Sequence, residues 1–293
     1  MLAIEELVRF GRDLDSDYRH PAATELGNRW GTAPPRFVRS SATHVLVADK
    51  VGEGRLVLRL RPAGDAETLR RASTAAQEWS AAGAPVVNGV LSLAGRVVET
   101  TEQYAAMALE VAEGPTLDEL EDDLADHAAD WGEALARLHA VRLSSPGLPD
   151  SPDLPLPRTP DVYGTLHGDP EADNIVLGEG GLCFVDPDEA RHGWFAADVA
   201  FALRDWSAPG RAPDLSAEVP RRFVEGYRRV RPLSDAELSW MPLLARESAR
   251  RELAGHERHL TAGPDEDWPE WATRLRVRID ERAAALRESL ATG

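Results

Sequence analysis

Three side chains that could handle a proton and a metal ion lie close together in the sequence. Asp169 stands in a polar loop, Asn174 opens the apolar run 175–177, and Asp186 follows the apolar run 182–185. An amide oxygen and a carboxylate, completed by water and phosphate oxygens, suit Mg²⁺, a hard ion that often takes few protein ligands. Asp169 is not needed as a ligand, so it can accept a proton. The pattern therefore predicts a metal site with a general base beside it.

Two short strands are the elements expected to bring these side chains together. The apolar runs are joined by a Gly-rich loop, which is typical of a β-hairpin. If Leu177 pairs with Leu182, counting back along both strands sets Asn174 beside Val185. Asn174 and Asp186 are then neighbours at the open end of the hairpin, within reach of one cation.

The segment resembles the catalytic core of the aminoglycoside phosphotransferase family, small-molecule kinases with a protein-kinase-like fold. The family's His-Gly-Asp-x4-Asn motif, its metal-binding Asp after an apolar strand and its bracing Asp on a later helix are all matched. The matching residues are His167, Gly168, Asp169, Asn174, Asp186 and Asp198. Several polar positions at the right spacings make this a stronger signal than a single motif.

The resemblance implies a role for each matched polar residue. Asp169 is expected to be the general base, and Asn174 and Asp186 are expected to bind Mg²⁺ on ATP. His167 is expected to orient the loop through backbone contacts, and Asp198 to accept hydrogen bonds from it. ATP and Mg²⁺ are the cofactors that follow.

Asp188 and Glu189 come directly after the predicted metal-binding strand end. They could contact the water of a second metal ion or a cationic acceptor. Equally, they could be surface charges, and the sequence leaves both interpretations open.

The first part of the chain is rich in strand patterns. A helix is expected over residues 2–13, and another over 66–82, where Gly83 and Pro85 end it. Strand patterns cover 36–38, 44–47, 56–60, 86–98 and 104–111. The resemblance implies an α+β, bilobal protein-kinase-like fold. We expect a small antiparallel-sheet lobe on the nucleotide side at 1–108, a hinge at 109–115, and a larger, mostly helical lobe with the acceptor pocket at 116–293.

The second part is mostly helical from Leu117 onward. Long helical patterns cover about 216–230, 234–262 and 268–290, and the proline-rich segment 146–160 is expected to be an extended loop. His139 lies at helical spacing with apolar residues, and we interpret it as a core histidine bonded to backbone.

Residues on the nucleotide side depart from the family pattern. Arg59 stands where these kinases usually carry a strand lysine, and it is expected to steady the ATP phosphates. The position of the helix glutamate that usually pairs with that lysine falls near Ala72, whereas Glu78 lies on another face and reads as a solvated side chain. Backbone groups of the hinge residues are expected to bind adenine; these are Glu110, Val111 and Ala112.

Composition narrows the class of partner. The chain has 293 residues and 43% hydrophobic content, enough for a substantial core, and no segment reads as a membrane span. Its net charge of −17 argues against nucleic acid and anionic membranes and permits a cationic small molecule. Cys183 is the only cysteine, so no intrachain disulfide can form. We expect a soluble cytoplasmic protein.

The leading hypothesis is an ATP- and Mg²⁺-dependent phosphotransferase acting on a hydroxyl of a small molecule. One alternative is a non-catalytic nucleotide-binding module, suggested by the altered nucleotide side. A less favoured one is a metal-dependent hydrolase built on His167, Asp169, Asp186, Asp188 and His192. The sequence leaves open the acceptor, which could be an antibiotic, sugar, amino alcohol or amino acid, and the oligomeric state.

Overall fold

The computed structural model describes residues 2–144, 147–259 and 267–292. The chain divides into two compact units. Unit 1 contains Met1–Ser73, Gly89–Val111 and Ala249–Gly293, and unit 2 contains Thr74–Asn88 and Ala112–Ser248. The lobes expected at 1–108 and 116–293, with their hinge at 109–115, are a different division and stay a prediction.

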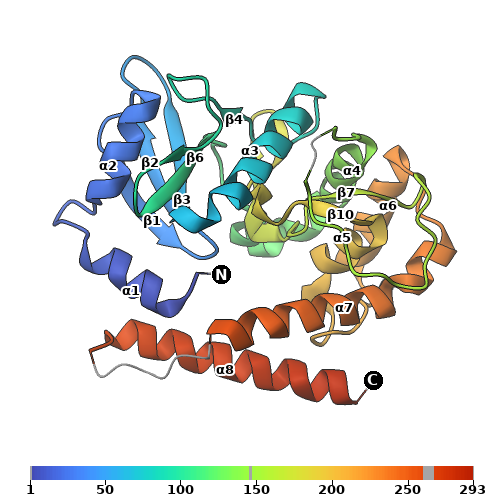
Figure 1. The fold of residues 1–293 in the computed structure, drawn as a ribbon. Coiled ribbons are helices and arrows are strands. Elements are labelled where there is room, and N and C mark those ends of the chain that lie inside the picture. The colour runs from blue at the N-terminus through green and yellow to red at the C-terminus, as the bar shows by residue number, and fades with distance from the viewer. Residues whose placement is uncertain (1, 145–146, 260–266, 293) are drawn as a thin grey trace. The chain divides into compact units, whose positions relative to one another are not determined.

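Unit 1 is built on one antiparallel sheet with the order β1-β2-β3-β6-β4, with β5 also pairing with β6 (Figure 1). Its strands are β1 (Arg36–Ser40), β2 (His44–Asp49), β3 (Arg55–Pro62), β4 (Gly89–Val90), β5 (Glu99–Thr100) and β6 (Tyr104–Glu110). The strands β2 and β3 pair antiparallel, as the expected antiparallel sheet requires.

Alternation along the strands explains which face of this sheet is covered. Leu56, Leu58 and Leu60 recur at the two-residue period of a strand and are buried in one cluster. The same cluster includes Phe10 of α1 (Ile4–Arg12), and Leu26 of α2 (Pro21–Gly27). A 3₁₀ helix, Asn28–Trp30, adds its buried tryptophan. The amino-terminal helices therefore cover the apolar face of the sheet.

The strand expected over residues 86–98 is mostly wrong. Only Gly89–Val90 is a strand there, and β5 begins after it. The reason is local: the Ser92 Oγ accepts hydrogen bonds from the N–H groups of Ala94 and Arg96 and donates one to Glu99. A serine that satisfies nearby backbone groups offers the chain a turn in place of a sheet ladder.

Unit 2 is mostly helical. Its helices are the 3₁₀ helix Leu117–Asp123, α4 (Leu124–Ala140), α5 (Phe195–Ala202) and α6 (Glu218–Val230). Its strands form two antiparallel pairs, β7 (Tyr163–Leu166) with β10 (Arg191–Trp194), and the hairpin of β8 (Ile175–Gly178) with β9 (Gly181–Phe184). Short 3₁₀ helices lie at Ala172–Asn174, Pro187–Glu189 and Arg204–Trp206.

Three further helices complete the chain. The helix α3 (Ala66–Ala81), preceded by the 3₁₀ helix Ala63–Asp65, runs from unit 1 into unit 2, and α7 (Asp235–His259) runs from unit 2 into unit 1. The last helix, α8 (Glu270–Ala291), belongs to unit 1. The expected helices are thus confirmed, except that 260–262 lie outside the described residues. No helix in the described part of the chain is long and apolar enough to cross a membrane.

The proline-rich segment is confirmed as irregular from residue 147 to 160, with one isolated bridge between Asp150 and His192. The first residue of the predicted loop, residue 146, lies outside the described part. An antiparallel sheet in one unit and helices in the other confirm the expected α+β class.

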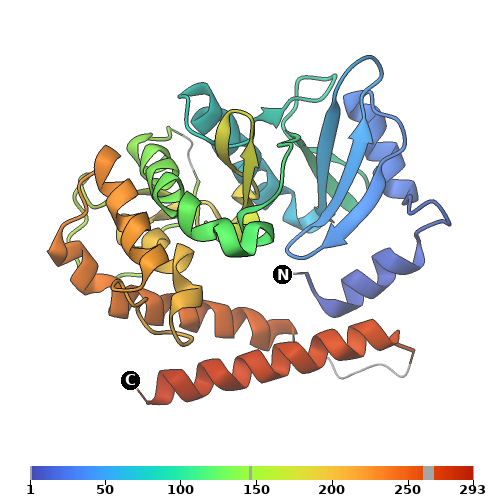
Figure 2. The ribbon, with the colours of Figure 1, turned by 180° about the vertical axis from the view of Figure 1, so that it is seen from behind.

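The core of unit 2 depends on close packing of α4 against α6, the pair of helices seen side by side in Figure 2. Trp131 of α4 meets the edge of Phe223 of α6, with ring centroids 5.1 Å apart. The backbones approach closely because Gly132 and Gly226 have no side chain. A Cβ on Gly226 would overlap the carbonyl group of Ala129.

Replacing Gly226 with alanine should therefore destabilise unit 2 by about 1–3 kcal/mol or more, the cost of overpacking a close contact. Urea unfolding followed by circular dichroism would measure this. Gly255→Ala in α7 is the matched control, because a Cβ there meets only the end of the Arg258 side chain, 4.0 Å away. The control should be neutral or stabilising, by at most about 1 kcal/mol. Equal effects of the two variants would contradict the packing argument.

Candidate active site

The predicted hairpin is confirmed in its register. Leu177 pairs with Leu182, and Ile175 pairs with Phe184. Beyond the last pair, the N–H of Val185 donates to the carbonyl oxygen of Asn174 at 2.9 Å. Asn174 and the residue that follows Val185, Asp186, therefore lie together at the open end of the hairpin.

Asn174 links this hairpin to the loop that carries Asp169. Its Nδ2 donates to the Asp169 Oδ2 at 3.0 Å and to the Asp169 carbonyl oxygen at 3.1 Å. Because the amide nitrogen is used twice, the amide plane is fixed and Oδ1 remains as the acceptor of this buried side chain. The carboxylate of Asp169 and the amide oxygen of Asn174 thus belong to one rigid corner.

Asp186 has an unusual backbone. Its φ and ψ are both 61°, in the left-handed region that few residues other than glycine adopt. Asp tolerates this region better than β-branched residues, and such strain concentrates at functional sites. The side chain is 8% exposed, so the strained turn sets a buried carboxylate beside Asn174. An amide oxygen and a carboxylate are donors that Mg²⁺ accepts.

Asp198 of α5 fixes the backbone of the loop at His167 and Gly168. Its carboxylate accepts hydrogen bonds from the N–H groups of His167 at 2.8 Å and Gly168 at 3.1 Å. His139 of α4 approaches the same carboxylate through Nε2 at 3.1 Å, while its Nδ1 lies 2.8 Å from the hydroxyl of Tyr227. The prediction that His139 is a core histidine is correct in burial but wrong in partner. A buried carboxylate needs donors from several directions, so both ring nitrogens bond side chains instead of backbone.

The pKa shifts of Asp198 and His139 determine which of the two carries a charge. Burial alone would raise the pKa of Asp198, but the hydrogen bond and charge of His139, with His167 and Arg191, outweigh burial and lower it. Burial lowers the pKa of His139 more than Asp198 raises it. At neutral pH a neutral His139 therefore donates Nε2–H to an ionised Asp198, and its Nδ1 accepts from Tyr227.

His167 contributes its backbone to the loop and its ring to the core. The ring is fully buried, stacks on Trp79 with centroids 6.4 Å apart, and tilts against Phe184 at 5.2 Å. Burial lowers the pKa of His167. The ring of His167 is therefore a core side chain of unit 2, and the hydrolase alternative, which gives it a metal-binding role, stays a prediction.

Arg191 is a loop anchor that sequence reasoning missed. This buried side chain of β10 donates from Nη2 to the Gly168 carbonyl oxygen at 2.7 Å. Gly168 has φ +88°, and a Cβ on it would overlap the carbonyl of Glu189 and the guanidinium of Arg191. The motif glycine gives a signal that something approaches this backbone, but nothing in the sequence identifies Arg191.

Glu171 was also missed, although it lies between Asp169 and Asn174. Its carboxyl group contacts the guanidinium of Arg204, which lies 4.5 Å from the ring of Phe201. Burial, followed by the hydrogen bond and negative charge of Asp169, raises the pKa of Glu171 to about 9, against the opposite effect of Arg204. Glu171 therefore carries a proton near neutral pH and can donate it in its hydrogen bond to Asp169.

The two acids after Asp186 have different surroundings. Asp188 is buried, with 8% exposure, whereas Glu189 is exposed and lies 3.8 Å from Arg191. The surface interpretation fits Glu189, and Asp188 is buried two positions after Asp186. Whether either contacts an acceptor or a second metal stays a prediction.

The nucleotide-side residues belong mostly to unit 1. Arg59 is buried on β3, where its neighbours across the sheet are Val45 and Met107. Glu110 ends β6, and the chain passes from unit 1 to unit 2 between Val111 and Ala112. Their roles toward ATP stay predictions.

The helix α3 shows what replaces the expected glutamate. Ala72 is buried, with 1% exposure. Glu78 was expected to be a solvated side chain on another face; it is half-buried, and its carboxylate also accepts hydrogen bonds from the N–H of Ser144 at 2.6 Å and from its hydroxyl at 3.1 Å. The carboxylate satisfies a loop that follows α4, which sequence spacing cannot reveal.

Among the residues described, no three or more His, Cys, Asp or Glu side chains are grouped so that they could hold a metal ion by themselves. The corner at Asn174 and Asp186 is a different donor set, with one amide and one carboxylate. Such a set suits a cation that also binds phosphate oxygens of a nucleotide.

Comparison with known proteins shows which family the chain matches. The chain matches the model of the phosphotransferase enzyme family, APH, over residues 36–165 and 156–233, which together cover more than half of it. Homoserine kinase of Neisseria meningitidis serogroup B is 32% identical over 173 residues, covering 55% of this chain and 53% of that protein. The chain thus spans about half the length of the curated relatives it matches.

Solved structures agree in fold. An amicoumacin kinase in complex with AMP-PNP, Ca²⁺ and Ami superposes with a TM-score of 0.67 at 16% identity, covering 97% of this chain and 93% of that one. A microcompartment-associated aminopropanol kinase superposes with a TM-score of 0.60 at 18% identity, covering 92% and 97%. At these identities the likeness concerns the fold, and it confirms the expected protein-kinase-like class.

Removing the charge of Asp198 should loosen the loop and the core together. We expect Asp198→Asn to lower the free energy of unfolding by about 1–3 kcal/mol, because the amide NH₂ that replaces one carboxylate oxygen leaves a buried N–H donor without its acceptor. Urea unfolding followed by circular dichroism measures it. Asp205→Asn, at an exposed aspartate of the same region, is the control and should change stability by less than about 0.5 kcal/mol. A loss no larger than the control's would show that the loop does not depend on this carboxylate.

Glu171 should leave a signature in the pH dependence of stability. Because its folded pKa is raised from 4.5 to about 9, the folded chain keeps a proton that the unfolded chain has lost, so this contribution to stability falls as pH rises from 4.5 to 9. Glu171→Gln removes the proton exchange. The free energy of unfolding of Glu171→Gln minus that of the parent should therefore increase from pH 5 to pH 9.

Chemical denaturation at several pH values measures this difference. Glu179→Gln, at an exposed acid in the loop between β8 and β9, is the control and should give a flat difference. A flat difference for Glu171→Gln as well would contradict the raised pKa.

Proposed function

The chain belongs to the phosphotransferase enzyme family, and we propose that it transfers the γ-phosphoryl group of ATP to a hydroxyl of a small molecule. The observation that carries the proposal is the corner formed by Asp169, Asn174 and Asp186, in which a half-buried carboxylate lies beside an amide and a strained, buried acid. Phosphoryl transfer requires mainly positioning and neutralisation of charge. A corner held rigidly by backbone and side-chain hydrogen bonds supports that requirement.

Asn174 and Asp186 are the residues proposed to hold Mg²⁺. The fit rests on the donor set, because the Asn174 amide nitrogen is used by Asp169 and leaves the oxygen for a cation. When bound, the ion would neutralise charge on the triphosphate. Arg59 is proposed to steady the phosphates, and the backbone of Glu110, Val111 and Ala112 to bind adenine.

Asp169 is proposed to orient the acceptor hydroxyl and to take its proton. Its Oδ2 is fixed by Asn174, and Glu171 contributes a second hydrogen bond to the same carboxyl group. These contacts restrict the rotation of Asp169, so the oxygen that meets the acceptor has a defined position. Asp198 and His167 are proposed to support the loop without touching the substrate.

The acceptor is proposed to be a small alcohol that also carries an amino group. The carboxyl groups of Asp169 and Asp173 lie close enough to Glu171 to raise its pKa, so negative charge gathers at the proposed base, in a chain of net charge −17. The related kinases named for homoserine and aminopropanol act, by those names, on amino alcohols. Reliance on ATP places the proposed reaction in the cytoplasm.

The rival is a non-catalytic nucleotide-binding module, and one observation favours it. Ala72, where kinases of this fold usually carry the glutamate that pairs with the strand cation, is buried and has no carboxylate. Activity measurements separate the two proposals, because both predict that ATP binds.

The test is ATP consumption by the purified chain with Mg²⁺ against amino alcohols, hydroxy amino acids and aminoglycosides. Asp169→Ala should lower kcat by about 10²–10⁴-fold while the KM for ATP changes little, since the loss concerns proton transfer. Glu179→Gln is the control and should retain turnover. A chelator should abolish turnover, and added Mg²⁺ should restore it.

Near-normal turnover of Asp169→Ala would refute the role given to Asp169. ATP-dependent thermal stabilisation without consumption on any of these acceptors would favour the non-catalytic module.

A further inference from the structure

A large cavity lies in unit 1, apart from every residue assigned to phosphoryl transfer. It has a volume of about 960 Å³ and lies between α1, the strand β1 and α8. Both ribbon views show α8 running beside α1 (Figures 1 and 2). A volume of this size is in the range that holds a small organic ligand.

The walls of the cavity are apolar. They are formed by Leu7, Phe10 and Leu14 on one side, Phe37 of β1, and Trp271 and Leu275 of α8. Beside the cavity the two helices are in contact through Ile4 and Val8, which pack on Ala272 and Ile279. The cavity is therefore the unfilled continuation of a real helix contact, and its walls would favour an apolar ligand body.

Positive charge gathers at the same cavity. Arg39, Arg274 and Arg278 line it, and no acidic residue does so within the described part of the chain. Arg274 is paired with Glu270, whereas Arg39 and Arg278 have no ion pair among residues 2–144, 147–259 and 267–292. In a chain with 50 acidic and 33 basic residues, a cation-only lining runs against the background.

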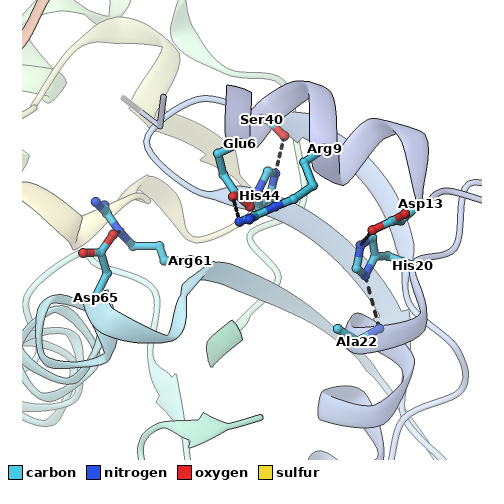
Figure 3. Close-up of polar contacts among 9 residues, drawn as sticks. All are labelled: Glu6, Arg9, Asp13, His20, Ala22, Ser40, His44, Arg61 and Asp65. Atoms are coloured by element: carbon cyan, nitrogen blue, oxygen red, sulfur yellow. Dashed lines mark hydrogen bonds and ion pairs between the residues drawn. The ribbon is translucent and has the colours of Figure 1, made fainter. Parts of the chain in front are cut away.

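The floor of the cavity is rigid. Ser40 lines it, and its Oγ lies 2.7 Å from His44 Nδ1; the other ring nitrogen, Nε2, lies 3.2 Å from Glu6 (Figure 3). Phe10 is stacked between the rings of His20 and His44, with centroids 4.0 and 3.7 Å away. A preformed floor lowers the cost of ordering side chains when a ligand binds.

The polar cluster below the floor consists of Glu6, Arg9, Ser40 and His44, whose side chains form hydrogen bonds and ion pairs with one another. Burial would raise the pKa of Glu6, but its hydrogen bonds with His44 and Tyr104 and the charge of Arg9 outweigh burial and lower it. Burial lowers the pKa of His44. Glu6 is thus an ionised acceptor engaged by its own neighbours, so the cluster leaves the arginines at the cavity as the charges available to a ligand.

We propose that this cavity binds an amphipathic organic anion, a carboxylate with a medium-length apolar chain. The apolar chain of this ligand lies between α1 and α8, and its carboxylate is bound by Arg39 and Arg278. Arginine suits this role because its guanidinium can donate two parallel hydrogen bonds to one carboxylate. The site is independent of the proposed phosphotransferase activity, and its occupation would tie α8 more firmly to the amino-terminal helix.

Calorimetric titration of the purified full chain with decanoate tests the proposal. We expect saturable binding at one site, at least 10-fold weaker binding of decanol, which lacks the charge, and no measurable binding of acetate, which lacks the chain. The double variant Arg39→Gln/Arg278→Gln should weaken decanoate binding at least 10-fold and leave decanol binding unchanged. Arg287→Gln, at an α8 arginine that pairs with Glu257 outside the cavity, is the matched control and should bind decanoate normally.

A second variant tests the location by filling the cavity. Gly11 of α1 lines it, and a Cβ there meets no atom within 4 Å, so Gly11→Leu should project into the space without disturbing the backbone. The variant should keep its thermal stability and lose decanoate binding by at least 10-fold. Undetectable binding of decanoate to the parent chain, equal affinities for decanoate and decanol, or unchanged affinity in Gly11→Leu would each overturn the proposal.

Discussion

The loop that carries Asp169 depends on one carboxylate, that of Asp198. This carboxylate is buried, ionised, and bonded to the backbone N–H groups of His167 and Gly168 and to the ring of His139. A buried charge is tolerated only where donors surround it, so the loop, α4 and α5 must all be in place for this carboxylate to be stable. The same constraint makes the loop rigid, because any shift of its backbone would leave a buried charge without a donor.

Further hydrogen bonds connect the loop around Asp169 to the hairpin of β8 and β9. Arg191 fixes the carbonyl of Gly168, and Asn174 fixes Asp169 while its own carbonyl accepts from Val185. These hydrogen bonds connect loops and short strands, and no long helix or strand takes part in them. The site gains its geometry from these hydrogen bonds, which supports the proposed chemistry, since phosphoryl transfer gains most from groups held in position before the reaction.

Unit 1 solves a related problem with aromatic rings. Its amino-terminal helix places Glu6 and Phe10 in the buried cluster with His44, so the helix is anchored by both charge and stacking. Close by, α8 packs on the same helix but leaves an apolar cavity with arginines around it. The polar side chains around His44 form hydrogen bonds with one another, whereas the arginines at the neighbouring cavity keep charge that is available to a ligand.

The sequence by itself determined the elements whose signals are local. The pairing of Leu177 with Leu182 followed from two apolar runs and a Gly-rich loop, and the long helices followed from apolar periodicity, because both patterns depend on near neighbours in the chain. The family motif also identified the proposed catalytic corner, because the polar residues that form it lie close together along the chain. The strand expected over residues 86–98 failed because the Ser92 side chain formed a turn with nearby backbone.

Only the tertiary structure decided the partners that come from distant parts of the chain. Tyr227 lies 88 positions from His139, Ser144 lies 66 from Glu78, and Arg191 lies 23 from Gly168. Spacing predicts which residues share a face of one helix or strand, but a side chain bonds whichever donor or acceptor the packing of other elements brings to it. The raised pKa of Glu171 and the cavity beside α8 have the same origin, since burial and enclosure arise only when separate elements pack together.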